Sequence, residues 1–291
     1  MQKIAFIGAG VMGKEMIKNF LKNNVEVYFY TRTKEKALDL IDLGAIYCDS
    51  VIECISNSKI IITMLGFPKD VRDVYLADNG IIKNAQEESY LIDMTTTDPD
   101  LTLEISNEAK KRGLHFLDAP VSGSDIKAKD ASLTIMVGAN RADFDKCYPI
   151  FECIGKTIIH EGPVSFGQHT KMANQIAISA NISGVCEALY YANKVGLDEN
   201  KTLITISSGA AASFQMDNMA PEILDEDFEA GFFVKHFVKD MKIALKEAKE
   251  NGANLPILEN VLKNYEELES KGYGDLGIQA LYKFYEDTGS V

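Results

Sequence analysis

The sequence is short of positive charge, poor in cysteine and free of any long uncharged run. Its 30 Lys and Arg residues are outnumbered by 43 Asp and Glu, which gives a net charge of −13. A chain this acidic offers no basic stripe for a phosphate backbone, so no nucleic-acid partner is expected. The 5 cysteines have neither CxxC nor Cys/His spacing. We therefore expect no disulfide framework and no metal site, and a reducing cytoplasm fits best.

Targeting and membrane segments are also missing from the pattern. Lys3 is followed at once by a short apolar run that ends in glycine, so we expect no secretory signal before the first strand. One of the longest uncharged stretches, residues 172–186, contains three side-chain amides and is too short for an ordinary membrane span. It predicts a buried helix, and no membrane partner is expected.

The first half of the chain alternates short β-branched runs with amphipathic stretches, a pattern typical of βαβ units and a parallel sheet. The predicted strands are 3–7, 26–30, 60–64, 90–93, 115–118 and 133–137. The predicted helices between them are 12–23, 34–42, 51–57, 68–76 and 99–112. After about residue 161 strand-like runs stop, and a long helical pattern covers about 164–194.

This change in pattern predicts two domains. Gly162 and Pro163 interrupt the pattern just before the long helix, so we place the boundary there. Residues 1–162 form the predicted dinucleotide-binding domain, and residues 163–291 form an all-helical substrate and dimerisation domain. The predicted fold class is α/β, with an N-terminal Rossmann-type, doubly wound, mostly parallel sheet joined to an all-α domain by a long helix.

A glycine-rich turn follows the first predicted strand and opens a helix. Gly8, Gly10 and Gly13 have the spacing in which the first glycine makes a tight turn, the second lets the backbone approach a pyrophosphate, and the third permits close helix–strand packing. The phosphates would lie at the positive end of the helix, beside Val11 and Met12. A nicotinamide dinucleotide is the expected cofactor.

The second predicted strand ends near Arg32, where an NAD-specific site usually places an acidic residue on the ribose 2′-hydroxyl. No acid is present here. Arg32 offers a planar cation for a 2′-phosphate, and Thr33 adds a hydroxyl donor, so NADP(H) is the expected cofactor and NAD remains possible. The alternative is a solvated arginine at the end of a strand.

Two further predicted strands end at polar or small residues. Met64 and Leu65 follow one strand, and Thr95 and Thr96 follow another. Open parallel sheets bind ligands at the carboxyl ends of their strands, so we expect Met64, Leu65 and Thr96 to line the cofactor. The alternative is that these threonines only cap their strand. For Thr95 this alternative is as well supported as a contact with the cofactor.

A turn made of proline, hydroxyls and glycine includes Ser122, Gly123 and Ser124. Such a turn exposes backbone donors to an anion. We expect it to hold a substrate carboxylate, the alternative being a generic loop between strand and helix.

The long predicted helix carries Lys171, Asn174 and Gln175 at i, i+3 and i+4, which places them on one face. Lys171 lies in an otherwise apolar stretch. Burial disfavours the charged form of a lysine, which suits it to proton transfer. Lys239 and Asp240 are expected to open a later amphipathic helix, and an exposed ion pair is the alternative for them.

Together these segments resemble the β-hydroxyacid dehydrogenase family, which includes 3-hydroxyisobutyrate dehydrogenases, tartronate semialdehyde reductases and glyoxylate/succinic semialdehyde reductases. The resemblance covers nearly the whole chain. It lies in the glycine turn and in segments 92–96, 118–124, 167–175 and 239–241.

The resemblance implies a role for each matching residue. Lys171 would be the general acid/base, Ser122–Ser124 would bind the substrate carboxylate, and Asn174 would hold the substrate. Lys239 would reach both cofactor and substrate. Two residues depart from the common pattern: Ser124 stands where many relatives have glycine, and Gln175 stands where many have a second asparagine, which leaves its role as a substrate contact open.

The expected function is an NADP(H)-preferring oxidoreductase that interconverts a small semialdehyde and its hydroxy acid, with a glyoxylate, succinic, tartronate or methylmalonate semialdehyde type of substrate. Two alternatives remain: an imine reductase of the same superfamily, against which Lys171 argues, and a non-catalytic dinucleotide-binding module. The 4 histidines lack a recognisable catalytic pattern. The long helix and the aromatic C-terminal segment predict a homodimer or a higher homo-oligomer.

Overall fold

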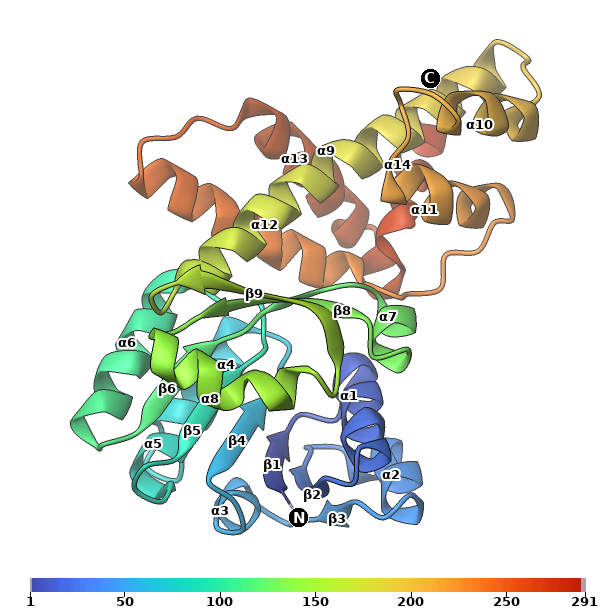
Figure 1. The fold of residues 1–291 in the computed structure, drawn as a ribbon. Helices are drawn as coiled ribbons and strands as arrows, with labels where there is room; N and C mark the ends of the chain where they lie inside the picture. Colours follow the sequence, from blue (N-terminus) through green and yellow to red (C-terminus); the bar gives the residue numbers. More distant parts are fainter. Residues whose placement is uncertain (1, 289–291) are drawn as a thin grey trace. The chain divides into compact units, whose positions relative to one another are not determined.

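The computed structural model describes residues 2–288, and only the backbone of residue 288. The chain divides into two compact units, one ending at Lys171 and the other beginning at Met172 (Figure 1). The first unit is built on a sheet and the second on helices.

The first unit contains a sheet whose described strands run in the order β3-β2-β1-β4-β5-β6-β8-β7, with β9 paired to β8. Neighbours from β3 to β6 are parallel, β8 is antiparallel to β6 and β7, and β9 is parallel to β8. The mostly parallel, Rossmann-type sheet predicted from the sequence is therefore confirmed. The strands are β1 (Lys3–Ile7), β2 (Glu26–Tyr30), β3 (Ile46–Tyr47), β4 (Ile60–Thr63), β5 (Tyr90–Asp93), β6 (His115–Asp118), β7 (Val121–Ser122), β8 (Leu133–Gly138) and β9 (Gly155–Gly162).

The strand order reverses between β1 and β4, because the chain passes from β1 outward to β2 and β3 and then returns to the other side of β1. In an open α/β sheet a ligand binds beside such a reversal, outside the carboxyl ends of the strands. The loops after β1, β4 and β5 lie there.

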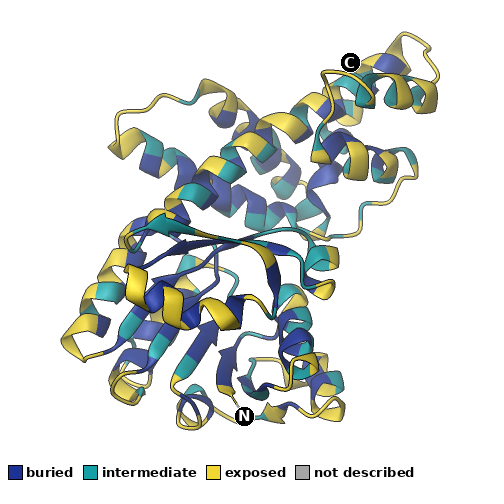
Figure 2. Ribbon diagram, in the orientation of Figure 1, coloured by how far each residue is buried: buried dark blue, intermediate teal, exposed yellow. Residues whose placement is uncertain are grey.

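Both faces of the sheet are covered. Along β1, Ile4 and Phe6 belong to one buried apolar cluster, while Ala5 and Ile7 belong to another. Alternate residues of a strand point to opposite faces, so a strand buried on both sides is apolar throughout, and Figure 2 shows β1 as buried. The covering helical elements are α1 (Val11–Lys22), η1 (Lys34–Ala37), α2 (Leu38–Asp42), α3 (Val51–Ile55), α4 (Pro68–Leu76), α5 (Ile81–Asn84), α6 (Pro99–Lys111), α7 (Asp125–Lys129) and α8 (Arg141–Phe151).

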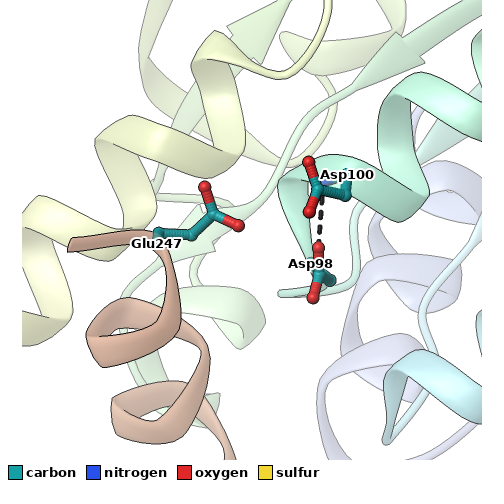
Figure 3. Close-up of side chains that lie close together, drawn as sticks. All are labelled: Asp98, Asp100 and Glu247. Carbon is teal, nitrogen blue, oxygen red and sulfur yellow. Dashed lines mark hydrogen bonds between the residues drawn. The ribbon is translucent and has the colours of Figure 1, made fainter. Parts of the chain in front are cut away.

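Local sequence signals explain several helix starts. Pro68 and Pro99 occupy the first turns of α4 and α6, where the missing proline N–H has no partner in any helix. The Asp98 carboxylate caps α6 by accepting a hydrogen bond from the Asp100 N–H at 2.9 Å, drawn as a dashed line in Figure 3.

The second unit is all-helical in its described part. Its apolar cluster is formed mainly by the long helix and by α12 and α13, and includes an edge-on contact between the rings of Phe237 and Tyr265 at 5.2 Å. The Tyr265 hydroxyl donates to the Ile278 carbonyl oxygen at 2.7 Å. The elements are α9 (Phe166–Lys194), which begins in the first unit, α10 (Glu199–Ser207), α11 (Phe214–Leu224), α12 (Val234–Glu250), α13 (Pro256–Ser270), η2 (Tyr273–Asp275), η3 (Ile278–Ala280) and α14 (Leu281–Thr288).

The prediction of a buried helix over 172–186 needs correction. The segment is helical, but it is buried on one side only: Ile182 and Cys186 are covered, while Ala173, Ala177 and Gly184 are exposed. The exposed positions carry small residues, which hydropathy cannot separate from core residues. No helix in the described part of the chain is long and apolar enough to cross a membrane.

Candidate active site

The three glycines of the turn after β1 differ in their surroundings. Gly8 has φ +106°, and a Cβ built on it would lie 2.1 Å from the Met64 carbonyl oxygen. A Cβ on Gly13 would lie 2.0 Å from the Gly8 carbonyl oxygen. A Cβ on Gly10 would meet nothing within 4 Å. Gly8 and Gly13 are therefore required by the packing of the turn, whereas the space beside Gly10 is open at the start of α1.

The start of α1 suits an anion. Gly10 is the N-cap residue, no side chain caps the helix, and no acidic residue lies in its first turn. Unpaired N–H groups and the positive end of the helix dipole together attract phosphate. The structure thus brings Gly10, Val11 and Met12 to a helix end that fits the predicted pyrophosphate.

Arg32 lies beyond the end of β2 and is exposed. Its Nη1 is 2.9 Å from Oδ1 of Asp70 in α4. Thr33 is also exposed and is the N-cap residue of η1. The Arg32 side chain is 76% exposed and the Asp70 side chain is 20% exposed. An ion pair in contact with solvent contributes only about 0–1 kcal/mol. Arg32 is therefore held loosely enough to exchange Asp70 for a phosphate group.

A buried polar chain fixes the loops after β4 and β5. The Thr63 hydroxyl donates to Asp93 Oδ1 at 2.7 Å, and the Tyr75 hydroxyl lies 2.9 Å from Thr63 Oγ1. The Leu65 N–H donates to Thr95 Oγ1 at 2.9 Å. Burial raises the pKa of Tyr75 well above its usual range, so its hydroxyl stays protonated. Thr95 itself is buried and bonded to the neighbouring loop, which gives it a structural role.

Gln168 is a residue that the sequence analysis missed. Its side chain is fully buried and holds the loop after β5 on both sides of Thr96: Oε1 accepts from the Thr97 N–H at 3.0 Å, and Nε2 donates to the Thr95 carbonyl oxygen at 2.8 Å. Thr96, the residue between them, is half-buried. A glutamine in the 167–175 segment gave no chemical signal, because its partners are more than 70 residues away.

Asp118 anchors the start of α9. Its carboxylate accepts from the Ser165 N–H at 2.7 Å and from the Gln168 N–H at 2.8 Å. Glycines enclose it, since a Cβ on Gly138 would lie 2.4 Å from Oδ1 and one on Gly167 would lie 2.8 Å from Oδ2. Burial raises the pKa of Asp118 to about 7, although the two N–H donors favour its charged form. The same residue thereby fixes Gln168 and the first turns of the long helix.

The predicted carboxylate-binding turn, Ser122–Ser124, begins at the last residue of β7 and ends just before α7. Gly123 has φ +134°, a conformation that residues with a side chain rarely adopt. Ser122 and Ser124 are half-buried, and Ser124 is the N-cap residue of α7 without a side-chain cap bond. The carboxamide of Asn19, in α1, donates to the Ala128 carbonyl oxygen at 2.6 Å, which ties α7 to the helix that follows the glycine turn.

Lys171, Asn174 and Gln175 share one face of α9, as predicted from their spacing. Lys171 is buried, with 7% of its surface exposed, and Gln175 is fully buried. In the second unit, Asn174 Nδ2 donates to Gln175 Oε1 at 2.7 Å, and Gln175 Nε2 donates to Asp240 Oδ2 at 2.7 Å. Lys239 Nζ lies 2.9 Å from Asp240 Oδ1.

The position of Lys239 within its helix differs from the prediction. Helix α12 begins at Val234, so Lys239 and Asp240 lie inside it and do not open it. Because Val234, Phe237 and Val238 are buried on the same side, the apolar stripe begins earlier than the Lys–Asp pair suggested. His236 lies one turn before Lys239, and burial and then the Lys239 charge lower its pKa to about 4. The imidazole is therefore neutral at pH 7.

Comparison with known proteins identifies the family. Residues 3–162 match the NAD binding domain of 6-phosphogluconate dehydrogenase, and residues 166–285 match the NAD-binding domain of NADP-dependent 3-hydroxyisobutyrate dehydrogenase. The chain belongs to the β-hydroxyacid dehydrogenase family. It is an NAD(P)-dependent oxidoreductase of the hydroxyacid dehydrogenase type that acts on small substrates.

Individual relatives of this hydroxyacid dehydrogenase align over nearly its whole length. An uncharacterized oxidoreductase of Bacillus subtilis, YkwC, is 48% identical over 97% of this chain and 98% of its own. A probable mitochondrial 3-hydroxyisobutyrate dehydrogenase-like protein of Arabidopsis thaliana is 40% identical over 99% of this chain and 86% of its own. The solved structure of 3-hydroxyisobutyrate dehydrogenase from Mycobacterium tuberculosis, with L-serine, has a TM-score of 0.87 at 25% identity and covers 97% of this chain and 98% of its own.

Proposed function

We propose that this hydroxyacid dehydrogenase is an NADP(H)-preferring enzyme that interconverts a small semialdehyde and its hydroxy acid, with Lys171 as general acid/base. The observation that carries the proposal is the buried Lys171 on the helix face that also presents Asn174. A lysine with 7% exposure is kept from bulk water, which favours direct proton exchange with a bound substrate.

In this proposal the binding residues and the proton-transferring residue have separate roles. Ser122, Gly123 and Ser124 receive the substrate carboxylate through hydroxyl and backbone donors. Asn174 and Lys239 are proposed to hold the substrate. When bound, the nicotinamide exchanges a hydride with the substrate carbon. In the reducing direction Lys171 gives a proton to the carbonyl oxygen, so that a hydroxyl group forms and the lysine becomes neutral.

Arg32 and the glycine turn support the cofactor part of the proposal. The exposed guanidinium of Arg32 stands beyond β2 with a weakly held partner, which suits a 2′-phosphate. The uncapped start of α1 suits the pyrophosphate. Met64, Leu65 and Thr96, at the carboxyl ends of β4 and β5, are proposed to line the nicotinamide side.

A substrate panel tests the proposal. NADPH oxidation at 340 nm is followed with glyoxylate, succinic semialdehyde, tartronate semialdehyde and methylmalonate semialdehyde, and NADP⁺ reduction with the matching hydroxy acids. We expect kcat/KM to be highest for one of the carboxylate-bearing aldehydes and at least tenfold higher with NADPH than with NADH. If the enzyme reduces a cyclic imine but none of the aldehydes, imine reduction replaces the proposed activity.

We also propose that the enzyme is a cytoplasmic homodimer or higher homo-oligomer. Its dimer contact would include Tyr191 on the exposed side of α9 and the exposed apolar residues Val195, Leu197 and Ile204 that follow in the chain. Contiguous exposed apolar surface is typical of an interface. A stable monomer at micromolar concentration in sedimentation velocity would contradict this assembly.

A further inference from the structure

Gln175 links three other residues of the second unit in a polar chain. Its Oε1 accepts from Asn174 and its Nε2 donates to Asp240, each at 2.7 Å. Gln175 is fully buried and Asp240 is 1% exposed. The ion pair of Asp240 with Lys239 at 2.9 Å extends the chain to a fourth residue. Two residues proposed to hold the substrate, Asn174 and Lys239, thus belong to one network.

The direction of each hydrogen bond follows from Asp240. An ionised carboxylate only accepts, so the Gln175 side chain must turn its Nε2 toward Asp240. Its Oε1 then faces Asn174, which must present Nδ2 to it. The buried carboxylate therefore sets the orientation of the Asn174 amide, although the two residues are 66 positions apart in the sequence.

We propose that Gln175 is a positioning residue, which holds Asn174 and the Lys239–Asp240 pair in fixed orientations for the substrate and does not itself bind it. The proposal rests on the proposed hydroxyacid dehydrogenase function. Both polar ends of the Gln175 carboxamide are already engaged at short distance, and the side chain has no exposed surface with which to contact a ligand. Loss of a buried hydrogen bond to a charged group is among the more damaging single changes.

Two substitutions of nearly equal volume separate positioning from packing. Gln175→Met fills the same space but removes both hydrogen bonds. Gln175→Glu keeps the shape and accepts from Asn174, yet its carboxylate repels that of Asp240 until one of the two binds a proton. Once it is protonated, the introduced carboxyl group donates to Asp240 as the amide does.

The kinetic expectations differ for the two variants. In Gln175→Met the KM for the aldehyde rises by about 10- to 100-fold at every pH, with kcat and the Kd of NADPH within about threefold of wild type. In Gln175→Glu the KM rises similarly at pH 8 and returns toward the wild-type value as the pH falls to 5.5. An unchanged KM in Gln175→Met would overturn the positioning role.

Each value is taken relative to wild type at the same pH, because other charged groups lie near this network. His236, Lys235 and Lys239 are on α12, Asp275 is in η2, and Lys171 is one turn earlier on α9. The comparison with wild type at the same pH removes the effects that these groups have in both proteins. Gln215→Met, which removes another buried carboxamide of the second unit, is the matched control and should leave KM unchanged.

Thermal melts test the network without any activity. The difference in Tm between wild type and Gln175→Glu should widen as the pH rises from 5 to 8, because the two carboxylates then repel each other. A pH-independent difference would overturn the network itself. If the wild-type enzyme turns over none of the aldehydes, the proposed function fails, and the melts still decide whether Gln175 and Asp240 are coupled.

Discussion

Arg32 and Asp70 form a 2.9 Å ion pair between the loop after β2 and helix α4. The pair occupies the guanidinium that is proposed to bind the 2′-phosphate of NADP(H). That phosphate therefore competes with Asp70 for the Arg32 charge, whereas NAD(H), which lacks the phosphate, leaves the pair unchallenged.

The first prediction concerns cofactor choice. Arg32→Ala should raise the Kd of NADPH by about 10- to 100-fold and change the Kd of NADH by less than about threefold, because only the former loses a charge-assisted contact. Fluorescence titration measures both constants. Asp70→Asn should leave the NADPH affinity equal or higher, since it removes the competing carboxylate.

A matched control lies on the same helix. Arg72 in α4 pairs with Glu104 through two hydrogen bonds of 2.8 and 2.6 Å, so Arg72→Ala removes an arginine without touching the loop after β2. It should leave both dissociation constants unchanged. Equal NADPH affinity in Arg32→Ala and Arg72→Ala would contradict the assignment of Arg32.

The second prediction concerns proton transfer. Lys171→Ala should lower kcat by about 100- to 10,000-fold while the Kd of NADPH stays near the wild-type value, because general acid/base catalysis is lost and the cofactor contacts are not. Lys194→Ala, at the other end of α9, is the control and should keep full activity. A Lys171→Ala enzyme with near-wild-type kcat would exclude Lys171 as the acid/base.

The sequence predicted those features that rest on local patterns. The bounds of β1, β2, β5 and β6 agree with the prediction because each is a short apolar run between turn residues. Strands β3, β7 and β9 and helices α5, α7 and α8 were missed. The antiparallel pairing of β7 with β8 depends on contacts across the sheet, and Pro149 inside α8 is a poor helix signal.

The residues of the candidate site also fall into two groups, those that a local pattern predicts and those that depend on distant contacts. Gly8, Gly10 and Gly13 could be predicted because their spacing itself reflects the backbone geometry. Gln168 could not, because a glutamine becomes informative only when its distant partners, such as Thr97, are known. The spacing of Gln175 predicted its face on α9, but its bond to Asp240 spans 65 residues and depends on the tertiary fold.

The third prediction concerns pH and stability. Burial raises the pKa of Asp118 from 3.8 to about 7, so the folded protein binds a proton there more tightly than the unfolded chain. This contribution to stability is fully present below about pH 4 and is lost as the pH rises through about 7, on the order of 4 kcal/mol in total. In Asp118→Asn this part of the pH dependence should disappear.

Unfolding by urea at pH 4.5, 6 and 8 measures the effect as the difference between wild type and Asp118→Asn. The variant is expected to be less stable than wild type at pH 4.5, because its amide N–H group would oppose one of the two N–H donors at the start of α9. Its deficit should shrink as the pH rises. Asp42→Asn, the same substitution at an exposed site, should show a constant difference.

The fourth prediction separates the folding and binding roles of the glycine turn. Gly13→Ala should destabilise the protein by about 3 kcal/mol or more, because the new methyl group would lie 2.0 Å from the Gly8 carbonyl oxygen. Gly10→Ala should fold with nearly the wild-type Tm, since Gly10 has φ −75° and its Cβ would meet nothing within 4 Å. Any effect of Gly10→Ala on activity must then arise in the complex with the cofactor.

That effect should be a loss of cofactor affinity. If the pyrophosphate approaches the backbone at Gly10, a methyl group there occupies the same space, and the Kd of both NADPH and NADH should rise at least tenfold. Arg32→Ala, by contrast, weakens only NADPH, so the two variants distinguish contact with the pyrophosphate from contact with the 2′-phosphate. A folded Gly10→Ala protein that binds both cofactors as wild type does would show that the open space beside Gly10 is not where the phosphates lie.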